Sequence, residues 1–425
     1  MFNMNGVFIL SDFIINNKCV LNGDVEISGS KNAALPVMAA TILTHGKTHL
    51  KNIPSLSDTD AMSDILTCLG ASVQKGSEYI IDTSHLASVP LPGEICTGIR
   101  ASFLVAGPLL ARFGKADVPL PGGCRIGSRP VDLHLKGFKA MGADFSVEDG
   151  YVKLRCQSLT GNNIYLDFPS VGATQNIIMA AVLAKGTTII ENSASEPEVT
   201  DLANYLIKCG ASIEGAGTDT IIINGVKELC PCEYSVIPDR IEAGTFMIGA
   251  ALTGGNVTLK GVNCSHLSAI SSKLSEVGAV ITEFSDELSI SCPGLRKHTD
   301  IQTLPFPGFP TDMQAQFASL MCTSDGTSVI TETVFENRFM YIPELVRMNA
   351  DIKLDGRCAI INGGTPLIGA RVKATDLRAG AALVLAGLCA EGITTVKNTK
   401  FIDRGYEDFE NNLSMLNADV RRKAI

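Results

Sequence analysis

The segment Leu69-Gly70-Ala71-Ser72 decides the fold of this chain, because it recurs in five altered copies: Met141-Gly142-Ala143-Asp144, Cys209-Gly210-Ala211-Ser212, Val277-Gly278-Ala279-Val280, Met348-Asn349-Ala350-Asp351 and Leu416-Asn417-Ala418-Asp419. Successive alanines are separated by 72, 68, 68, 71 and 68 residues. Gly or Asn precedes each alanine, and both residues tolerate the left-handed conformation that ends many helices. The sequence therefore predicts six repeats of about 70 residues each.

A second marker runs in phase with the first. A glycine opens each of the segments 46–48, 114–116, 186–188, 255–257, 326–328 and 392–394. Before each glycine lies a helix that is apolar on nearly all sides and is therefore expected to be buried. These predicted helices span residues 33–42, 101–111, 173–184, 244–252, 313–322 and 379–390. A strand, an amphipathic helix such as 199–209 and alternating strands such as 151–155 follow, which makes each repeat an α/β unit.

The two ends of the sequence indicate how the repeats divide into domains. Seven residues follow Ala418, and strand-like stretches at 7–15 and 19–27 precede the first predicted helix. We infer that the N-terminal segment completes the sixth repeat. The prediction is a continuous lobe of three repeats at 30–237 and a discontinuous lobe of three repeats at 1–29 plus 238–425. A hinge near Ser30 and Pro238 would join them, with ligand bound in the cleft.

Composition favours a globular protein of a reducing compartment. Apolar residues make up 45% and charged residues 19%, which excludes intrinsic disorder. The net charge of −9 argues against a protein that coats nucleic acid or an anionic membrane, and no uncharged apolar run reaches the length of a membrane span. The start lacks the features of a signal peptide, and the 13 scattered cysteines form no Cys-x-x-Cys pair. We therefore expect a cytoplasmic protein without a zinc site or disulfide framework.

Polar residues gather at the starts of the apolar helices. Lys31, Arg100 and Arg378 stand at such positions, where free N–H groups and the helix dipole already favour an anion. The added cations predict an anionic ligand, although helix capping and surface solvation are the alternative for any one of them. Asp312 begins another such helix and is either its N-cap or a general base.

The stretch 121–130, which reads Pro-Gly-Gly-Cys-Arg-Ile-Gly-Ser-Arg-Pro, predicts a surface loop because of its Gly and Pro content. Two arginines, Arg125 and Arg129, would favour the reactive thiolate form of Cys124. The alternative is that Cys124 is one more small buried hydrophobic residue. A cysteine phosphatase needs five residues between Cys and Arg, whereas four separate Cys124 from Arg129, so that class is excluded.

These segments resemble the UDP-N-acetylglucosamine 1-carboxyvinyltransferase family, the enolpyruvyl transferases that open peptidoglycan synthesis. The resemblance is carried, in order along the chain, by residues 29–33, 121–134, 238–242, 310–316, 333–339, 376–378 and 403–406. It implies a two-lobed inside-out α/β barrel with three repeats per lobe and buried helices surrounded by sheets. The six repeats found above agree with that architecture.

The resemblance implies transfer of enolpyruvate from phosphoenolpyruvate to the 3-hydroxyl of UDP-N-acetylglucosamine, with phosphate released and no metal or organic cofactor. Cys124 on a mobile lid would be the acid, Asp312 the base and Lys31 a catalytic cation. Lys31, Arg129 and Arg404 would hold phosphoenolpyruvate. The substrate-binding residues implied are Asn32, Arg100, Arg129, Asp132, Leu133, Ser170, Gly172, Val334, Arg378 and Arg404. It further implies a cytoplasmic enzyme of cell wall synthesis, cell shape and cell division, with neither nucleic acid nor membrane as partner, and a target of fosfomycin.

Three residues depart from the family pattern. Phe168 stands in place of a Lys near the diphosphate, Leu104 in place of a Trp, and Arg125 in place of a small residue. Among other readings, the shikimate-3-phosphate enzyme shares the fold but lacks the Gly-Gly-Cys loop. A catalytically silent nucleotide-sugar-binding paralogue would not need an acid and a base. A ring-forming DNA clamp also has six repeats, but a net charge of −9 suits it poorly.

Overall fold

The computed structural model describes residues 11–16, 18–96, 99–121 and 131–424 of the chain, and these group into two compact units. One unit, here the contiguous unit, comprises residues 29–121 and 131–237. The other, here the split unit, comprises residues 11–28 and 238–424. No helix within the described ranges combines the length and the apolarity needed to cross a bilayer.

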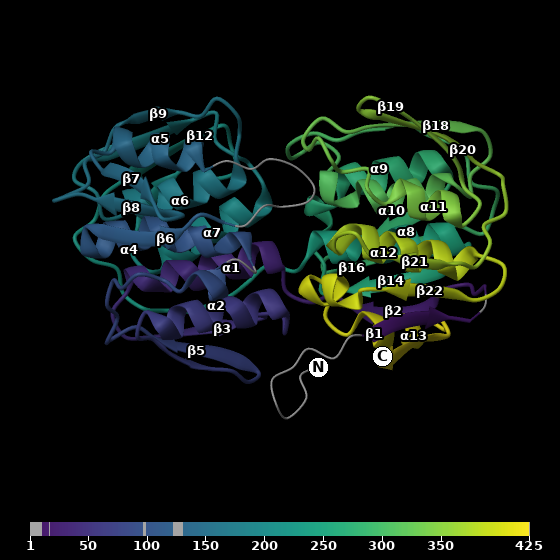
Figure 1. The fold of residues 1–425 in the computed structure, drawn as a ribbon, viewed down its shortest axis with the longest axis horizontal. Coiled ribbons are helices and arrows are strands. Elements are labelled where there is room, and N and C mark those ends of the chain that lie inside the picture. Colours follow the sequence, from purple (N-terminus) through teal and green to yellow (C-terminus); the bar gives the residue numbers. More distant parts are fainter. Residues whose placement is uncertain (1–10, 17, 97–98, 122–130, 425) are drawn as a thin grey trace. The chain divides into compact units, whose positions relative to one another are not determined.

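The contiguous unit holds three repeats of helices and mostly antiparallel strands (Figure 1). Its helices are α1 (Lys31–Ala40), α2 (Ser57–Cys68), α3 (Gly93–Cys96), α4 (Ala106–Phe113), α5 (Asp132–Ala140), α6 (Val171–Ala181) and α7 (Pro197–Lys208), with 3-10 turns η1 (Thr41–Leu43) and η2 (Arg100–Val105). Its strands are β3 (Lys47–Lys51), β4 (Ser72–Gln74), β5 (Glu78–Asp82), β6 (Lys115–Pro119), β7 (Asp144–Glu148), β8 (Tyr151–Arg155), β9 (Asn163–Tyr165), β10 (Thr187–Glu191), β11 (Ser212–Glu214), β12 (Thr220–Asn224) and β13 (Glu233–Ser235). They form three sheets, ordered β13-β3-β5-β4, β6-β8-β7 and β11-β12-β10-β9.

The split unit repeats this plan (Figure 1). Its helices are α8 (Arg240–Thr253), α9 (Ser268–Val277), α10 (Gln314–Met321), α11 (Ile342–Arg347), α12 (Leu377–Cys389) and α13 (Phe409–Met415), with 3-10 turns η3 (Cys264–His266), η4 (Thr311–Met313) and η5 (Thr399–Arg404). Its strands are β1 (Ser11–Ile15), β2 (Asn22–Glu26), β14 (Asn256–Lys260), β15 (Val280–Glu283), β16 (Glu287–Ser291), β17 (Ile301–Gln302), β18 (Thr327–Thr331), β19 (Asp351–Asp355), β20 (Cys358–Asn362), β21 (Arg371–Lys373), β22 (Thr394–Lys397) and β23 (Val420–Ala424). The sheet orders are β15-β16-β14-β2, β17-β18-β20-β19 and β21-β22-β1-β23.

The backbone confirms the sixfold repeat. The six residues that precede the marker alanines all have positive φ, namely Gly70 at 100°, Gly142 at 92°, Gly210 at 106°, Gly278 at 108°, Asn349 at 73° and Asn417 at 71°. This left-handed conformation turns the chain from helix to strand, which explains why only Gly and Asn occupy the position. A strand also follows each of the six second-marker glycines, as predicted.

Three of the six sheets include a parallel strand from the preceding repeat. Thus β9 pairs with β10, β17 with β18 and β21 with β22 in parallel, and β13 of the third repeat returns to pair with β3 of the first. The N-terminal segment completes the sixth sheet through β1, as inferred, whereas β2 completes the fourth sheet by pairing with β14. The sheets stay separate, and no closed barrel of hydrogen-bonded strands forms within the described residues.

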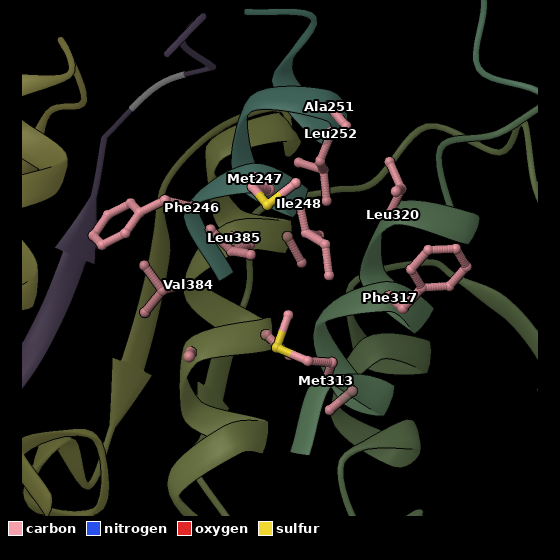
Figure 2. Close-up of a cluster of buried hydrophobic side chains, with 14 of the residues drawn as sticks. Phe246, Met247, Ile248, Ala251, Leu252, Met313, Phe317, Leu320, Val384 and Leu385 are labelled. Carbon is pink, nitrogen blue, oxygen red and sulfur yellow. The ribbon is translucent and has the colours of Figure 1, made fainter. Parts of the chain in front are cut away.

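The three apolar helices of each unit lie in its core. In the split unit α8, α10 and α12 pack on one another, with the fully buried Ile248, Met313 and Leu385 between them, whereas Phe246 and Phe317 point outward (Figure 2). Small residues let these helices approach closely, since a Cβ on Gly249 would lie 3.1 Å from carbon atoms of both Leu21 and Leu385. The helix starts thereby become fixed points from which polar side chains can project.

Candidate active site

Asp312 and Arg378 meet in the split unit, although 66 residues separate them. Asp312 lies in η4, and its N-cap is Pro310, so the alternative role of Asp312 as an N-cap is wrong. Arg378 lies in the first turn of α12, where the Asp376 carboxylate caps the helix by accepting from the backbone N–H of Arg378 at 3.0 Å. The Arg378 guanidinium donates to Asp312 Oδ2 from Nη2 at 3.1 Å and from Nε at 3.3 Å.

A second arginine holds the other oxygen of the same carboxylate. Arg338 Nη2 donates to Asp312 Oδ1 at 2.8 Å, and both the Arg338 and Arg378 side chains are buried, at 4% and 3% exposed. The Asp312 side chain is 28% exposed. Two guanidinium groups thus fix the plane of a carboxylate that solvent or a ligand can still reach. Arg378 Nη1 is buried without an acceptor among the described residues, as a donor to an anionic ligand would be.

A buried polar network lies against Arg378. Its guanidinium carbon stands 5.3 Å from the centre of the Tyr406 ring, in the range of a cation–π contact. The Tyr406 hydroxyl lies 2.9 Å from Thr245 Oγ1 and accepts from Gln316 Nε2 at 3.2 Å. All three partners are buried, so rotation of Arg378 would break contacts of the core.

Glu332 anchors the loop that carries Val334. Its buried carboxylate accepts from the backbone N–H of Val334 at 2.8 Å and of Phe335 at 3.1 Å. The same carboxylate accepts from Thr311 Oγ1 at 2.9 Å, directly beside Asp312 in the chain. Val334, predicted to bind substrate, is therefore half-buried and tied to the segment that carries the predicted base.

In the contiguous unit, Lys31 begins α1 and is buried against Asp58 of α2. Their Nζ and Oδ2 atoms are 3.2 Å apart, and the two side chains are 10% and 5% exposed. Ser30, one residue earlier, has a buried hydroxyl without a hydrogen-bond partner among the described residues. Asn32 is half-buried on the first turn of α1. A fixed ammonium group beside a helix start suits a phosphate or a carboxylate.

His134 is the centre of a second polar cluster in this unit. Asn176 Oδ1 accepts from the backbone N–H of Gly107 at 2.8 Å, so its Nδ2 must be the donor to Phe103 O and to His134 Nδ1, both at 2.9 Å. Since Nδ1 accepts, the neutral imidazole carries its proton on Nε2. Burial, with a smaller effect from the charge of Arg100, lowers the pKa of His134 to about 3.

Most residues predicted to bind the nucleotide-sugar surround His134 in sequence or in space. Asp132 is exposed and Leu133 half-buried on the first turn of α5, just before His134. Ser170 caps α6 by accepting from the backbone N–H of Ala173 at 3.4 Å. A Cβ on Gly172 would lie 3.3 Å from His134 Cε1, so glycine leaves room beside the ring.

The structure also places the departures from the family pattern. Phe168, two residues before Ser170, is 45% exposed, and its carbonyl accepts from the backbone N–H of Ser170 at 2.7 Å. Leu104 is buried in η2. Cys124, Arg125 and Arg129, with residues 122–130 of the loop predicted at 121–130, lie outside the described residues.

Arg404 is the last residue of η5 and is half-buried. Asp403 precedes it, and both its oxygens accept hydrogen bonds from the guanidinium of Arg422 on β23. Three partners of the predicted residues, namely Arg338, Asp58 and Tyr406, were not assigned a role from the sequence. A buried lysine such as Lys31 needs an opposite charge, which was a signal for an acidic partner such as Asp58. The sequence held no such signal for Arg338 or Tyr406.

Comparisons with known proteins agree on one family. The family model described as EPSP synthase (3-phosphoshikimate 1-carboxyvinyltransferase) matches residues 15–413. A UDP-N-acetylglucosamine 1-carboxyvinyltransferase 1 of Caldanaerobacter subterraneus is 53% identical over 97% of this chain and 99% of its own. A UDP-N-acetylglucosamine 1-carboxyvinyltransferase 2 of Carboxydothermus hydrogenoformans is 54% identical over the same shares.

Solved structures show the same fold. The enolpyruvyl transferase NikO from Streptomyces tendae aligns with a TM-score of 0.89 at 26% identity, over 98% of this chain and 100% of that one. An EPSP synthase from Acinetobacter baumannii aligns with a TM-score of 0.75 at 20% identity, over 97% and 100%. The separate sheets around apolar helices are therefore shared with enolpyruvyl transferases.

Proposed function

Because this chain belongs to the EPSP synthase family and, within it, to the UDP-N-acetylglucosamine 1-carboxyvinyltransferases, we propose that it transfers enolpyruvate from phosphoenolpyruvate to the 3-hydroxyl of UDP-N-acetylglucosamine. The observation that carries this proposal is the identity of 53% and 54% with two enzymes of that name over nearly full length. Such identity favours an active transferase over a silent nucleotide-sugar-binding paralogue. It also favours this acceptor over shikimate 3-phosphate.

The reaction is an addition followed by an elimination. The sugar oxygen bonds to C2 of phosphoenolpyruvate while C3 gains a proton, which gives a tetrahedral phosphate ketal. C3 then loses a proton, the double bond re-forms, and the C2–O bond to phosphate breaks. The enzyme must therefore supply a base for the sugar hydroxyl, an acid for C3 and cations for the phosphate and carboxylate.

We assign the base to Asp312. Two facts support this assignment: its plane is held by Arg338 and Arg378, and its side chain is 28% exposed. A carboxylate in a fixed orientation can remove the sugar proton without first having to reorganise. The acid is assigned to Cys124 through the family resemblance, since this residue lies outside the described part of the chain.

We assign phosphoenolpyruvate to Lys31, Arg129 and Arg404, with help from Arg100 and Arg378. The buried ammonium group of Lys31 and the unpartnered Nη1 of Arg378 support this assignment. The nucleotide-sugar is assigned to the remaining predicted residues: Asn32, Asp132, Leu133, Ser170, Gly172 and Val334. We propose that the two units are the domains 30–237 and 1–29 plus 238–425.

The same proposal places the enzyme in the cytoplasm, at the first committed step of peptidoglycan synthesis, with consequences for cell shape and division. It also makes Cys124 the residue that fosfomycin alkylates. Loss of one thiol per chain after fosfomycin treatment, blocked in Cys124→Ser, tests that assignment. Arg125→Ala should slow this alkylation, because Arg125 would stabilise the thiolate.

The direct test is phosphate release from phosphoenolpyruvate with UDP-N-acetylglucosamine present, absent, or replaced by shikimate 3-phosphate. We expect release only with the nucleotide-sugar, and a loss of at least about 100-fold in Asp312→Asn. Asp286→Asn is the matched control, because Asp286 is an exposed carboxylate of the same unit. Release with shikimate 3-phosphate, or none with either acceptor, would contradict the proposal.

A further inference from the structure

All three guanidinium nitrogens of Arg422, on the C-terminal strand β23, donate hydrogen bonds to other side chains of the protein. Nε donates to Glu410 Oε1 at 2.6 Å, and Nη2 donates to Glu410 Oε2 at 3.1 Å and to Asp403 Oδ1 at 2.7 Å. Nη1 donates to Asp403 Oδ2 at 2.9 Å and lies 3.3 Å from Ser11 Oγ. A guanidinium has five N–H groups, so this residue is occupied in holding its neighbours.

The two carboxylates enclose one short segment of chain. Asp403 stands directly before Arg404, and Glu410 lies in the first turn of α13, so residues 404–409 run between the two anchors. Both Asp403 oxygens are engaged by the planar fork of the guanidinium, a geometry that fixes the carboxylate in orientation as well as in distance. One side chain of the C-terminal strand thus holds both ends of the segment that begins with Arg404.

Arg422 is itself held in place by the sheet. Arg422 pairs directly with Phe13 of β1 in the antiparallel register, and its guanidinium carbon lies 4.7 Å from the centre of the Phe13 ring. Phe13 is fully buried, and the Arg422 side chain is 25% exposed. Partial burial strengthens the ion pairs relative to those of a fully solvated surface arginine.

We propose that Arg422 is a positioning residue for phosphoenolpyruvate binding, which acts through Asp403 on Arg404. The inference rests on the proposed function, in which Arg404 contacts phosphoenolpyruvate. Arg422 would touch neither substrate. Its loss would leave the fold of the split unit intact, but would let the segment at 404–409 move and would weaken the grip of Arg404 on the anion.

The test compares Arg422→Lys and Asp403→Asn with Arg421→Gln. Lysine keeps the charge but cannot form the two-pronged contact, and asparagine keeps the shape of Asp403 without its charge. Arg421 is the matched control, because it is the neighbouring residue of the strand, with a 74% exposed side chain that pairs only with Asp419 at 3.0 Å among the described contacts.

In Arg422→Lys and Asp403→Asn we expect the KM for phosphoenolpyruvate to rise about 10-fold, while the KM for UDP-N-acetylglucosamine stays within about twofold of the parent. Arg421→Gln should change neither constant. An equal rise in both constants, or no rise in either, would overturn the inference, because a purely structural role predicts no selectivity. Turnover of the parent tests the proposed function separately, since a parent without UDP-N-acetylglucosamine-dependent phosphate release would refute that function whatever the variants do.

Discussion

Glu242 makes the stability of the split unit depend on pH in a direction unusual for a carboxylate. The side chain is 2% exposed; Oε2 accepts from the backbone N–H of Ser28 at 2.9 Å, and Oε1 has no partner among the described residues. Burial, aided by the nearby charges of Asp239 and Glu407, raises the pKa of Glu242 from 4.5 to about 8. The folded state therefore keeps a proton that the unfolded state releases.

The sign and size of the change in stability with pH follow from these two pKa values. Below pH 4.5 both states hold the proton, and the contribution to folding is fully present. As the pH rises toward 8, the unfolded state is ionised while the folded state is still protonated, so stability is lost. At about 1.4 kcal/mol for each pKa unit, the loss between about pH 5 and about pH 8 is about 3 to 4 kcal/mol.

Glu242→Gln removes the titration and keeps an oxygen that can accept from Ser28. Hydrogen–deuterium exchange of peptides from α8, in parent and variant at the same pH, reports local stability and cancels the intrinsic exchange rate. We expect the ratio of variant to parent protection to grow about 300-fold between about pH 5 and about pH 8. Any destabilisation by the new amide group that does not change with pH cancels when the ratios at the two pH values are compared. A ratio that changes less than about threefold would refute the reasoning, and exposed Glu391→Gln should show no change.

Three further predictions concern other groups. The free energy of unfolding of the contiguous unit should fall by about 2 kcal/mol between about pH 7.5 and about pH 5, because the pKa of His134 is lowered from 6.5 to about 3 and only the unfolded state gains the proton. Hydrogen–deuterium exchange of α5 peptides would show this fall, and His134→Asn should remove the dependence on pH. Arg338→Met should lower kcat for phosphate release about 10- to 100-fold with a smaller effect on either KM, since Arg338 holds the plane of the proposed base; an unchanged kcat would contradict that role. Cys209 and Cys232, whose sulfurs lie 3.5 Å apart, should form a disulfide under diamide with loss of two titratable thiols, and a loss that persists in Cys232→Ser would exclude this pair.

The repeat could be predicted because it depends on local backbone chemistry. Gly70 and its five equivalents need positive φ, and a residue type that permits it is visible in any sequence. Helix boundaries depend on less visible effects. The predicted helix at 101–111 is divided into η2 and α4, and Pro108, which lacks an N–H group, lies in the first turn of α4, where no intrahelical donor is needed.

The residues of the candidate site could be predicted only where their position along the chain was enough to place them at the start of a helix. Lys31 and Arg378 were expected at helix starts and lie there. The contact of Asp312 with Arg338 could not be derived from spacing, because a separation of 26 residues that spans α10 and β18 has no fixed geometry. The same holds for Arg422 and Asp403, which meet only because β23 returns beside β1.

The pairing of β1 with β23 has a consequence for synthesis on the ribosome. Every strand of the contiguous unit lies within residues 47–235, so its three sheets can close while the rest of the chain is still being made. The sheet of the sixth repeat must wait, because Phe13 pairs with Arg422, which is synthesised after the other three strands of that sheet. Until then, β1 leaves unsatisfied N–H and C=O groups exposed to other chains. We expect nascent chains stalled shortly before Val420 to resist protease across residues 29–96, 99–121 and 131–237, to be cleaved in the split unit and to recruit holdase chaperones.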